Sequence, residues 1–347
     1  MMTSLERVVA ALQHKEADHV PVYPLINSIS RTYCGIDYPT WSKDPDLCAE
    51  SIIRATEDIG VDVICTLQDL SVEAADFGQK VDYPLNDAAH PSLAKRLIQD
   101  IDDYARLTPI NPRITPRMSA QIKICDTLVK KKGKDTPIVA FVFGPLGLLS
   151  MLRGQSEMFL DCLDDPDAMH VALEVVTETL MEYCKALIET GVHAIMFDTL
   201  FASQSIMRKE MWVELEFKYI QRLSDYVHSQ GCMVMIHNCG NGIYFDVQIE
   251  AMKPEAISFL HPTDDCASLA EVKEKYGSVT TLIGCIEPSW LLSASREDVI
   301  AKSKQEIDTM GKGGGFILST GCEYPSGLAA DHAKTIVETA RTYGRCK

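Results

Sequence analysis

A histidine and two cysteines are the residues best placed for chemistry. His237 and Cys239 come at the end of the apolar run CMVMIH, and Cys322 follows another apolar run, GFILST. In extended chain, residues two apart point to the same side, and Gly240 lets the backbone turn beneath a bound ion. Imidazole and thiolate are preferred zinc ligands, and three of them leave one position open, as in catalytic zinc sites. The pattern predicts a catalytic zinc site with His237, Cys239 and Cys322 as ligands.

The ligand types also indicate the reaction. Zinc held by two thiolates and one imidazole carries little net charge, so a substrate thiol at the open position loses its proton yet stays nucleophilic. Such a site suits alkyl transfer to sulfur, whereas hydrolytic zinc sites use His₃ or His₂Glu ligation. A nucleophilic Cys–His pair and ordinary core packing are the alternatives. A zinc deaminase is disfavoured because the HxE and PCxxC elements are missing.

Eight short apolar runs are candidates for the strands that position these residues. They are residues 20–26, 61–67, 137–144, 193–200, 232–237, 256–261, 279–285 and 315–320. Continuous Val, Ile and Phe runs are typical of parallel strands that are covered on both faces. Helical patterns separate the runs, as in residues 167–191, 296–314 and 331–344. The sequence therefore predicts a (β/α)₈ TIM barrel.

The remaining segments fit around this barrel. A doubly wound open sheet is disfavoured because no GxGxxG opens a helix after a strand. A helix around Leu5 to Gln13 forms an N-terminal extension, and residues 80–135, too long for one connection, form an excursion between strands two and three that packs over the barrel. We expect residues 1–347 to form a single domain, since barrels often exceed the usual domain length.

Polar residues directly after each predicted strand should meet at the C-terminal face of the barrel. They are Asn27, Gln68, Asp69, Glu73, Asp198, His237, Cys239, His261, Cys285 and Cys322. Asp198 is a candidate general base or substrate-orienting group, with helix capping as the alternative. Asn27, Gln68 and Glu73 are candidate substrate-binding residues, with hydrogen bonding among the loops as the alternative.

The composition indicates which classes of partner and which cellular compartment to expect. The formal net charge of −16 disfavours nucleic acid and anionic membranes as partners. The N-terminal segment lacks the features of a signal peptide, and no run is long enough to span a membrane. Twelve scattered cysteines without CxxC pairs fit a reducing compartment. We expect a cytoplasmic protein.

Several motifs resemble those of the uroporphyrinogen decarboxylase superfamily, and within it the zinc-dependent methylcobamide:coenzyme M methyltransferases. They are ERVVAALQHKEADHVPVYP at the start, DLSVEAADFG (69–78), FGPLGLL (143–149), GVHAIMFDTLFAS (191–203), MIHNCGN (235–241) and GGGFILSTGCEYPSG (313–327). The last two match the family's zinc ligands at His237, Cys239 and Cys322. The resemblance implies a Zn²⁺ barrel that takes a methyl group from a corrinoid (methylcobamide) carried by a partner protein and transfers it to a small thiol.

Other activities within the superfamily stay open. Decarboxylases carry a paired-arginine segment near the first strand, where this chain has only Arg31 in PLINSISRTYCG. A different acceptor or donor, such as tetrahydrofolate or a methylated substrate, is a second alternative, and a regulatory barrel with structural zinc is a third.

One departure from the methyltransferase pattern bears on the acceptor. The methyltransferases have an acidic residue after strand six that can ligate zinc, whereas this chain has Leu260 and His261 there. His261 is a candidate substrate-binding residue and fourth ligand, with a packing or capping role as the alternative. Cys285 is a less favoured candidate for the fourth ligand, and the identity of the acceptor thiol is left open.

Overall fold

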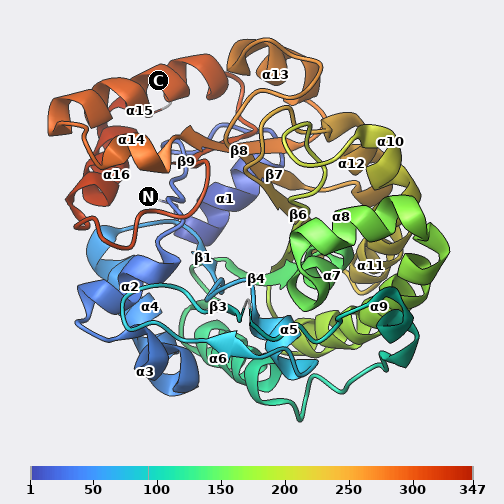
Figure 1. Ribbon diagram of the computed structural model, residues 1–347. Helices are drawn as coiled ribbons and strands as arrows, with labels where there is room; N and C mark the ends of the chain where they lie inside the picture. Colours follow the sequence, from blue (N-terminus) through green and yellow to red (C-terminus); the bar gives the residue numbers. More distant parts are fainter. Residues whose placement is uncertain (1, 93, 346–347) are drawn as a thin grey trace.

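A curled sheet of parallel strands forms the centre of the protein, seen in a computed structural model that describes residues 2–92 and 94–345 (Figure 1). Within these residues, seven strands pair in the order β1-β4-β5-β6-β7-β8-β9, and every pairing is parallel. The strands are β1 (Ile64–Cys65), β4 (Ile138–Phe143), β5 (Ala194–Asp198), β6 (Met233–Asn238), β7 (Ala256–Phe259), β8 (Thr281–Ile286) and β9 (Phe316–Thr320). The prediction of a parallel α/β sheet is confirmed, and seven of the eight predicted runs contain a strand.

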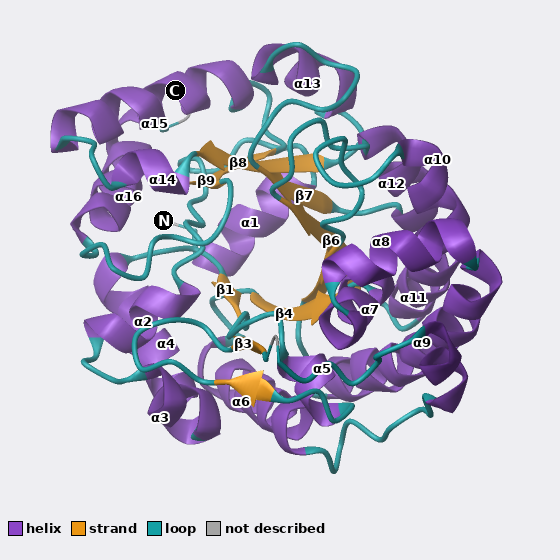
Figure 2. Cartoon of the chain, in the orientation of Figure 1, coloured by secondary structure: helices purple, strands orange, loops and turns teal. Residues whose placement is uncertain are grey.

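The first predicted run, residues 20–26, is not a regular strand. Val22 forms an isolated parallel bridge with Leu318 of β9. On its other side, the carbonyl of Val22 accepts a hydrogen bond of 2.8 Å from the backbone N–H of Asp62, just before β1. The two prolines of VPVYPLI have no N–H to donate, so the run cannot form a continuous ladder. The segment therefore spans the gap between β9 and β1 without completing a regular eighth strand (Figure 2).

Helices cover the outside of the curled sheet (Figure 2). All helices of the described part of the chain are α1 (Ser4–Leu12), α2 (Asn27–Tyr33), α3 (Tyr38–Lys43), α4 (Pro45–Ile59), α5 (Val72–Asp76), the 3₁₀-helix η1 (Ile101–Arg106), α6 (Pro116–Lys132), α7 (Pro145–Arg153), α8 (Gln155–Asp164), α9 (Pro166–Glu189), α10 (Lys209–Trp212), the π-helix η2 (Val213–Phe217), α11 (Lys218–Ser229), α12 (Phe245–Met252), α13 (Leu269–Tyr276), α14 (Pro288–Leu291), α15 (Arg296–Met310) and α16 (Asp331–Tyr343), and of these α1 lies at one end of the sheet instead of on its outside. None of these helices has the length and apolar character needed to cross a membrane.

Helix α1 confirms the predicted N-terminal helix and lies at the N-terminal ends of the strands. Thr3 and Glu6 form a capping box that fixes its first turn. Val8 and Ala11 pack into the cluster of side chains inside the curled sheet. The hydroxyl of Thr281, the first residue of β8, donates to the carbonyl of Ala11 (3.1 Å). The helix therefore closes one end of the sheet and leaves the opposite end for the site.

The long stretch between β1 and β4 divides into two parts. Its first part holds α5, η1 and the short antiparallel pair β2 (Val81–Asp82) and β3 (His90–Pro91). Its second part, α6, lies in the outer layer of helices, where it packs against α4, α5 and α9. The predicted excursion over residues 80–135 is therefore too long: α6 is the covering helix of this β–α unit, because its buried residues face neighbouring helices.

The inside of the curled sheet is filled with apolar side chains below the site. This cluster includes Tyr23, Val63, Cys65, Val139, Phe141, Met196, Met235, Ile283 and Ile317. Alternate residues of a strand point to the same side, so Asp198 follows Met196 and His237 follows Met235 on the inner face. The polar residues at the strand ends thus come directly above the packed cluster.

Candidate functional site

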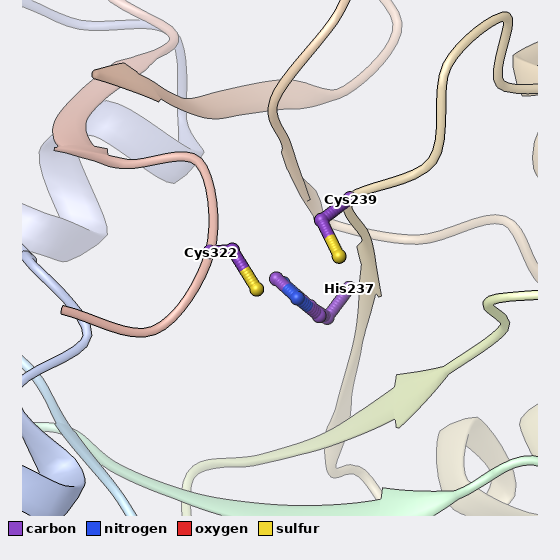
Figure 3. A group of neighbouring side chains, drawn as sticks. All are labelled: His237, Cys239 and Cys322. Atoms are coloured by element: carbon purple, nitrogen blue, oxygen red, sulfur yellow. The ribbon is translucent and has the colours of Figure 1, made fainter. Parts of the chain in front are cut away.

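His237, Cys239 and Cys322 lie together at the C-terminal ends of the strands, and Figure 3 shows their side chains converging. One ligand atom from each residue lies within 4.8 Å of the other two. Tetrahedral zinc with ordinary bond lengths would hold such atoms roughly 3.6–3.8 Å apart, which small side-chain adjustments achieve. His237 is buried in β6, whereas both cysteines are half-buried in the turns after β6 and β9. The donor set and its spacing therefore fit a zinc ion.

The imidazole of His237 is oriented by the neighbouring strand. His237 pairs in register with Ser258 of β7, and its Nδ1 lies 3.1 Å from the Ser258 hydroxyl. Ser258 is fully buried, so this contact fixes the ring without help from solvent. Because Nδ1 is engaged, Nε2 is the nitrogen left for an ion.

Two glycines allow the cysteine-bearing turns to approach other segments closely. A Cβ on Gly240 would lie 2.3 Å from the Ser203 hydroxyl oxygen. A Cβ on Gly321 would lie 2.6 Å from the Cα of Leu260. The φ angles of both glycines lie outside the left-handed region. Gly240 is thus required for close packing, which differs from the turn flexibility predicted for it.

The two thiols differ in their tendency to ionise. A hydrogen bond from Cys322 lowers the pKa of Cys239, and the same bond, together with burial, raises the pKa of Cys322 well above its usual range. Burial opposes protonation of His237, but its hydrogen bond with Cys322 and the nearby acidic groups outweigh burial and raise the pKa of His237. Cys239 is therefore the more readily ionised thiol of the two, and a cation bound at both sulfurs would displace the proton of Cys322.

Asp198 lies beside the three-residue group. It is the last residue of β5 and pairs in register with His237 on one side and Phe143 of β4 on the other. Its carboxylate is buried, and its Oδ1 has no hydrogen-bond partner among the described residues. Burial raises the pKa of Asp198 to about 6. The helix-capping alternative is wrong, because the next helix, α10, begins at Lys209.

The other residues predicted to bind substrate differ in what they contact. Gln68 Nε2 lies 3.2 Å from the sulfur of Cys48, and Glu73 accepts from the backbone N–H of Phe143 (3.2 Å). Burial raises the pKa of Glu73 to about 7. Asn27 is buried at the start of α2, and its Nδ2 has no partner within the described chain. The structure gives Gln68 and Glu73 contacts within the fold, and leaves Asn27 with a free donor.

Comparison with known proteins places the chain in a family. The model of the uroporphyrinogen decarboxylase (URO-D) family matches residues 3–343. The chain belongs to the URO-D family.

Within the URO-D family, the chain is similar to methyltransferases. It is 23% identical to the methylcobamide:CoM methyltransferase MtbA of Methanosarcina mazei, with 98% of each chain covered. It is 24% identical to the methylcobamide:CoM methyltransferase MtaA of Methanosarcina barkeri, with 97% of each covered. A solved methyltransferase from Methanosarcina mazei has the same fold, with a TM-score of 0.84, 20% identity and 99% of each chain covered.

His261 lies outside the three-residue group. Together with Cys285 it lines a groove of about 550 Å³ between the ends of β7 and β8 and the helices α14 and α15. Leu260 lines the same groove and also lies against Gly321. Cys285 is buried, and burial raises its pKa well above the usual range. The structure therefore does not bring His261 or Cys285 into the group of potential ligands.

Glu323 is a site residue that the sequence reasoning missed. It follows Cys322 directly and is half-buried. Its Oε1 accepts hydrogen bonds from the backbone N–H (3.0 Å) and the hydroxyl of Ser28, which lies near the start of α2. Burial raises the pKa of Glu323, and its charge acts on His237. Its position next to Cys322 in STGCEYP was the one available signal.

Arg117 is a second missed residue. Its guanidinium pairs with Asp69 at 2.6 Å, and both side chains are almost completely buried. Asp69 also accepts hydrogen bonds from Tyr38 and from the backbone N–H of Ser71 (2.8 Å). Nothing in the sequence around Arg117 in α6 indicates this partner, which lies 48 residues away along the chain.

Proposed function

We propose that this protein is a zinc-dependent methyltransferase that moves a methyl group between a methylated corrinoid protein and a small thiol such as coenzyme M. The observation that carries the proposal is the group of two thiol sulfurs and one imidazole nitrogen within 4.8 Å of one another at the strand ends. Membership of the URO-D family and similarity to methylcobamide:CoM methyltransferases support the corrinoid partner and the thiol acceptor.

His237, Cys239 and Cys322 would hold the ion. When bound there, zinc would supply the Lewis acidity that keeps an acceptor thiol deprotonated and nucleophilic. Ser258 holds the imidazole of His237 in its orientation through Nδ1. Asp198 is buried beside His237 with its Oδ1 unpartnered among the described residues, and it would take up the proton that the acceptor thiol releases on binding.

The arrangement of the strands supports a zinc-dependent methyltransferase. We propose that residues 1–347 act as one domain and that the segment around Val22 completes a closed (β/α)₈ barrel, since it bonds to both edges of the seven-stranded sheet. Enzymes with this architecture place their reactive groups at the C-terminal ends of the strands. Such positions are occupied by the three potential ligands and Asp198, whereas Asn27 follows the irregular segment around Val22.

Decarboxylation fits the residues less well. Arg31, the arginine available near the first strand, donates to the carbonyl of Asn86 (2.8 Å) and lies over the ring of Tyr38. A decarboxylase would also leave the two half-buried cysteines beside His237 without a function. Transfer to tetrahydrofolate, or from a methylated substrate to the corrinoid, uses the same zinc site and is the second candidate.

Metal analysis with matched cysteine variants tests the zinc site. We expect about one zinc per chain in the wild-type protein and in the control variant Cys34→Ala, whose half-buried cysteine directly follows α2, but little zinc in Cys239→Ala and Cys322→Ala. Wild-type protein without zinc, or undiminished zinc in both site variants, would overturn the assignment.

A second assay tests the reaction. Demethylation of free methylcobalamin, followed by its absorbance, should require zinc and a thiol acceptor. Turnover with tetrahydrofolate alone would favour the second candidate, and zinc binding without turnover with any acceptor would favour a regulatory barrel.

A further inference from the structure

Arg31 on α2 is a buried arginine without a carboxylate partner. The residue is only 2% exposed. Its Nη2 donates to the backbone carbonyl of Asn86 (2.8 Å), and its Cζ lies 5.7 Å from the centre of the Tyr38 ring. Within the part of the chain that the structure describes, its Nε has no hydrogen-bond partner and no carboxylate forms an ion pair with it. Because buried charges in proteins are normally paired, this guanidinium favours a ligand that brings a negative charge.

Arg31 lies at the same end of the sheet as the potential zinc ligands. It is three residues after Ser28 on α2, so the two side chains leave the helix on the same side. Ser28 binds Glu323, the residue after Cys322, through its backbone N–H (3.0 Å) and its hydroxyl. The helix face that contacts the segment of Cys322 is therefore the face that carries Arg31.

The acidic residues nearest to Arg31 have other partners. Asp69, in the loop after β1, pairs with Arg117 at 2.6 Å. Asp37 is exposed, and its carboxylate caps α3 by accepting from the backbone N–H (2.9 Å) and the hydroxyl of Thr40. Neither carboxylate neutralises Arg31, so its charge is left for a bound molecule.

From this arrangement we propose that the acceptor thiol carries an oxyanion group, which Arg31 binds while the zinc site holds the sulfur. The inference rests on the proposed function and narrows its acceptor class. On one side of a guanidinium, Nε–H and an N–H of Nη2 match two oxygens of a sulfonate or carboxylate. Arg7 binds both oxygens of Asp18 in this way, through Nε (2.7 Å) and Nη2 (3.2 Å). Arg31 acts as a specificity-determining residue.

Four small thiols with the same two-carbon chain test the inference. Coenzyme M ends in a sulfonate, 3-mercaptopropionate in a carboxylate, 2-mercaptoethanol in a neutral hydroxyl and cysteamine in an ammonium group. Isothermal titration calorimetry of the zinc-loaded protein measures their binding without turnover. We expect both anionic thiols to bind at least about 10-fold more tightly than 2-mercaptoethanol, and cysteamine to bind most weakly, because hydrogen bonds between charged groups are the strong ones.

Variants assign the preference to Arg31. Arg31→Gln removes the positive charge, so the advantage of the anionic thiols over 2-mercaptoethanol should fall by roughly 10-fold. Arg31→Lys keeps the charge but not the paired N–H groups, so it should retain part of that advantage. Arg222→Gln, an exposed position on α11, should leave the advantage unchanged. Asp198 and Glu323 are the same in all these proteins, so the comparison isolates the contribution of Arg31.

The charge-removing variant is expected to fold. No carboxylate of the described residues pairs with Arg31, so Arg31→Gln leaves no buried anion without its cation. If the variant nevertheless fails to fold, the order of the four thiols in the wild-type protein still decides the inference.

The outcomes separate this inference from the proposed function. Binding of 2-mercaptoethanol or cysteamine as tight as that of the anionic thiols would overturn the oxyanion acceptor while leaving methyl transfer intact. An anionic preference that Arg31→Gln retains in full would overturn the role of Arg31. If none of the four thiols binds the zinc-loaded protein or accepts a methyl group from methylcobalamin, the proposed function fails, and the inference with it.

Discussion

Replacing Gly321 with alanine should weaken zinc binding although Gly321 is not a ligand. Gly321 precedes Cys322, and its backbone N–H donates to the carbonyl of Ile286 at the end of β8 (2.9 Å). On its other side, an added Cβ would lie 2.5 Å from Cδ1, 2.6 Å from Cα and 2.7 Å from Cβ of Leu260. The turn that carries Cys322 is therefore held between β7 and β8, with no room for a methyl group.

The expected size of the effect follows from these distances. Non-bonded carbons prefer about 3.5–4.0 Å, so the turn or Leu260 must move by roughly 1 Å. Rotation of the Leu260 side chain relieves the contact with Cδ1 but not the contact with Cα. Overpacking of this kind costs about 1–3 kcal/mol. Zinc ligand distances tolerate only about 0.2 Å, so a shift of Cys322 should lower zinc affinity by roughly 10- to 100-fold.

A glycine in the same loop gives the matched control. A Cβ on Gly327 would meet no atom within 4 Å, so Gly327→Ala should retain wild-type zinc affinity and stability. Competition with a chromophoric chelator measures zinc affinity, and urea unfolding of the metal-free proteins measures the change in stability. If Gly321→Ala binds zinc as tightly as Gly327→Ala and unfolds at the same urea concentration, the contact does not position Cys322.

Two further predictions concern buried charges near the strand ends. Arg117→Met leaves the Asp69 carboxylate buried without its cation, so the free energy of unfolding measured by urea titration should fall by about 3–5 kcal/mol. In the double variant, the added Asp69→Asn change should recover most of that loss. A loss below about 1 kcal/mol in Arg117→Met would contradict this expectation. Because the pKa of Glu73 is raised to about 7, the folded protein holds that proton more tightly than the unfolded chain, and the resulting stability is lost as pH rises from about 4.5 through about 7. Glu73→Gln should remove this decline, on the order of 1–3 kcal/mol between pH 5 and 8, and parallel curves for variant and wild type would show that Glu73 does not titrate in this range.

The sequence predicted the strands and the ligand group because both depend on local pattern. Nearly all residues of the confirmed strands are buried on both faces, as in the six residues of β4. The spacing of His237 and Cys239 follows from the geometry of an extended chain, and residues after parallel strands share one end of the sheet. These rules place Cys322 near His237 although 85 residues separate them.

What the sequence did not predict depends on partners that are distant in the chain. Arg117 is one of several charged residues in and near α6, and only the folded structure shows that it pairs with Asp69. Ser28 and Glu323 are 295 residues apart, and their contact forms because the segment around Val22 lies beside β9. The run 20–26 is apolar enough to be predicted as a strand, but its two prolines lack N–H groups and so make it irregular.

The segment after β7 lies where a fourth zinc ligand could come from. The methyltransferase pattern has an acidic residue there, and His261 was a candidate for its place, with a packing or capping role as the alternative. In the structure, His261 lines the outer groove, whereas the backbone of Leu260 packs against Gly321 next to Cys322. We infer that this segment positions Cys322 by packing and supplies no ligand. The fourth position at the zinc would then be open to the acceptor thiol.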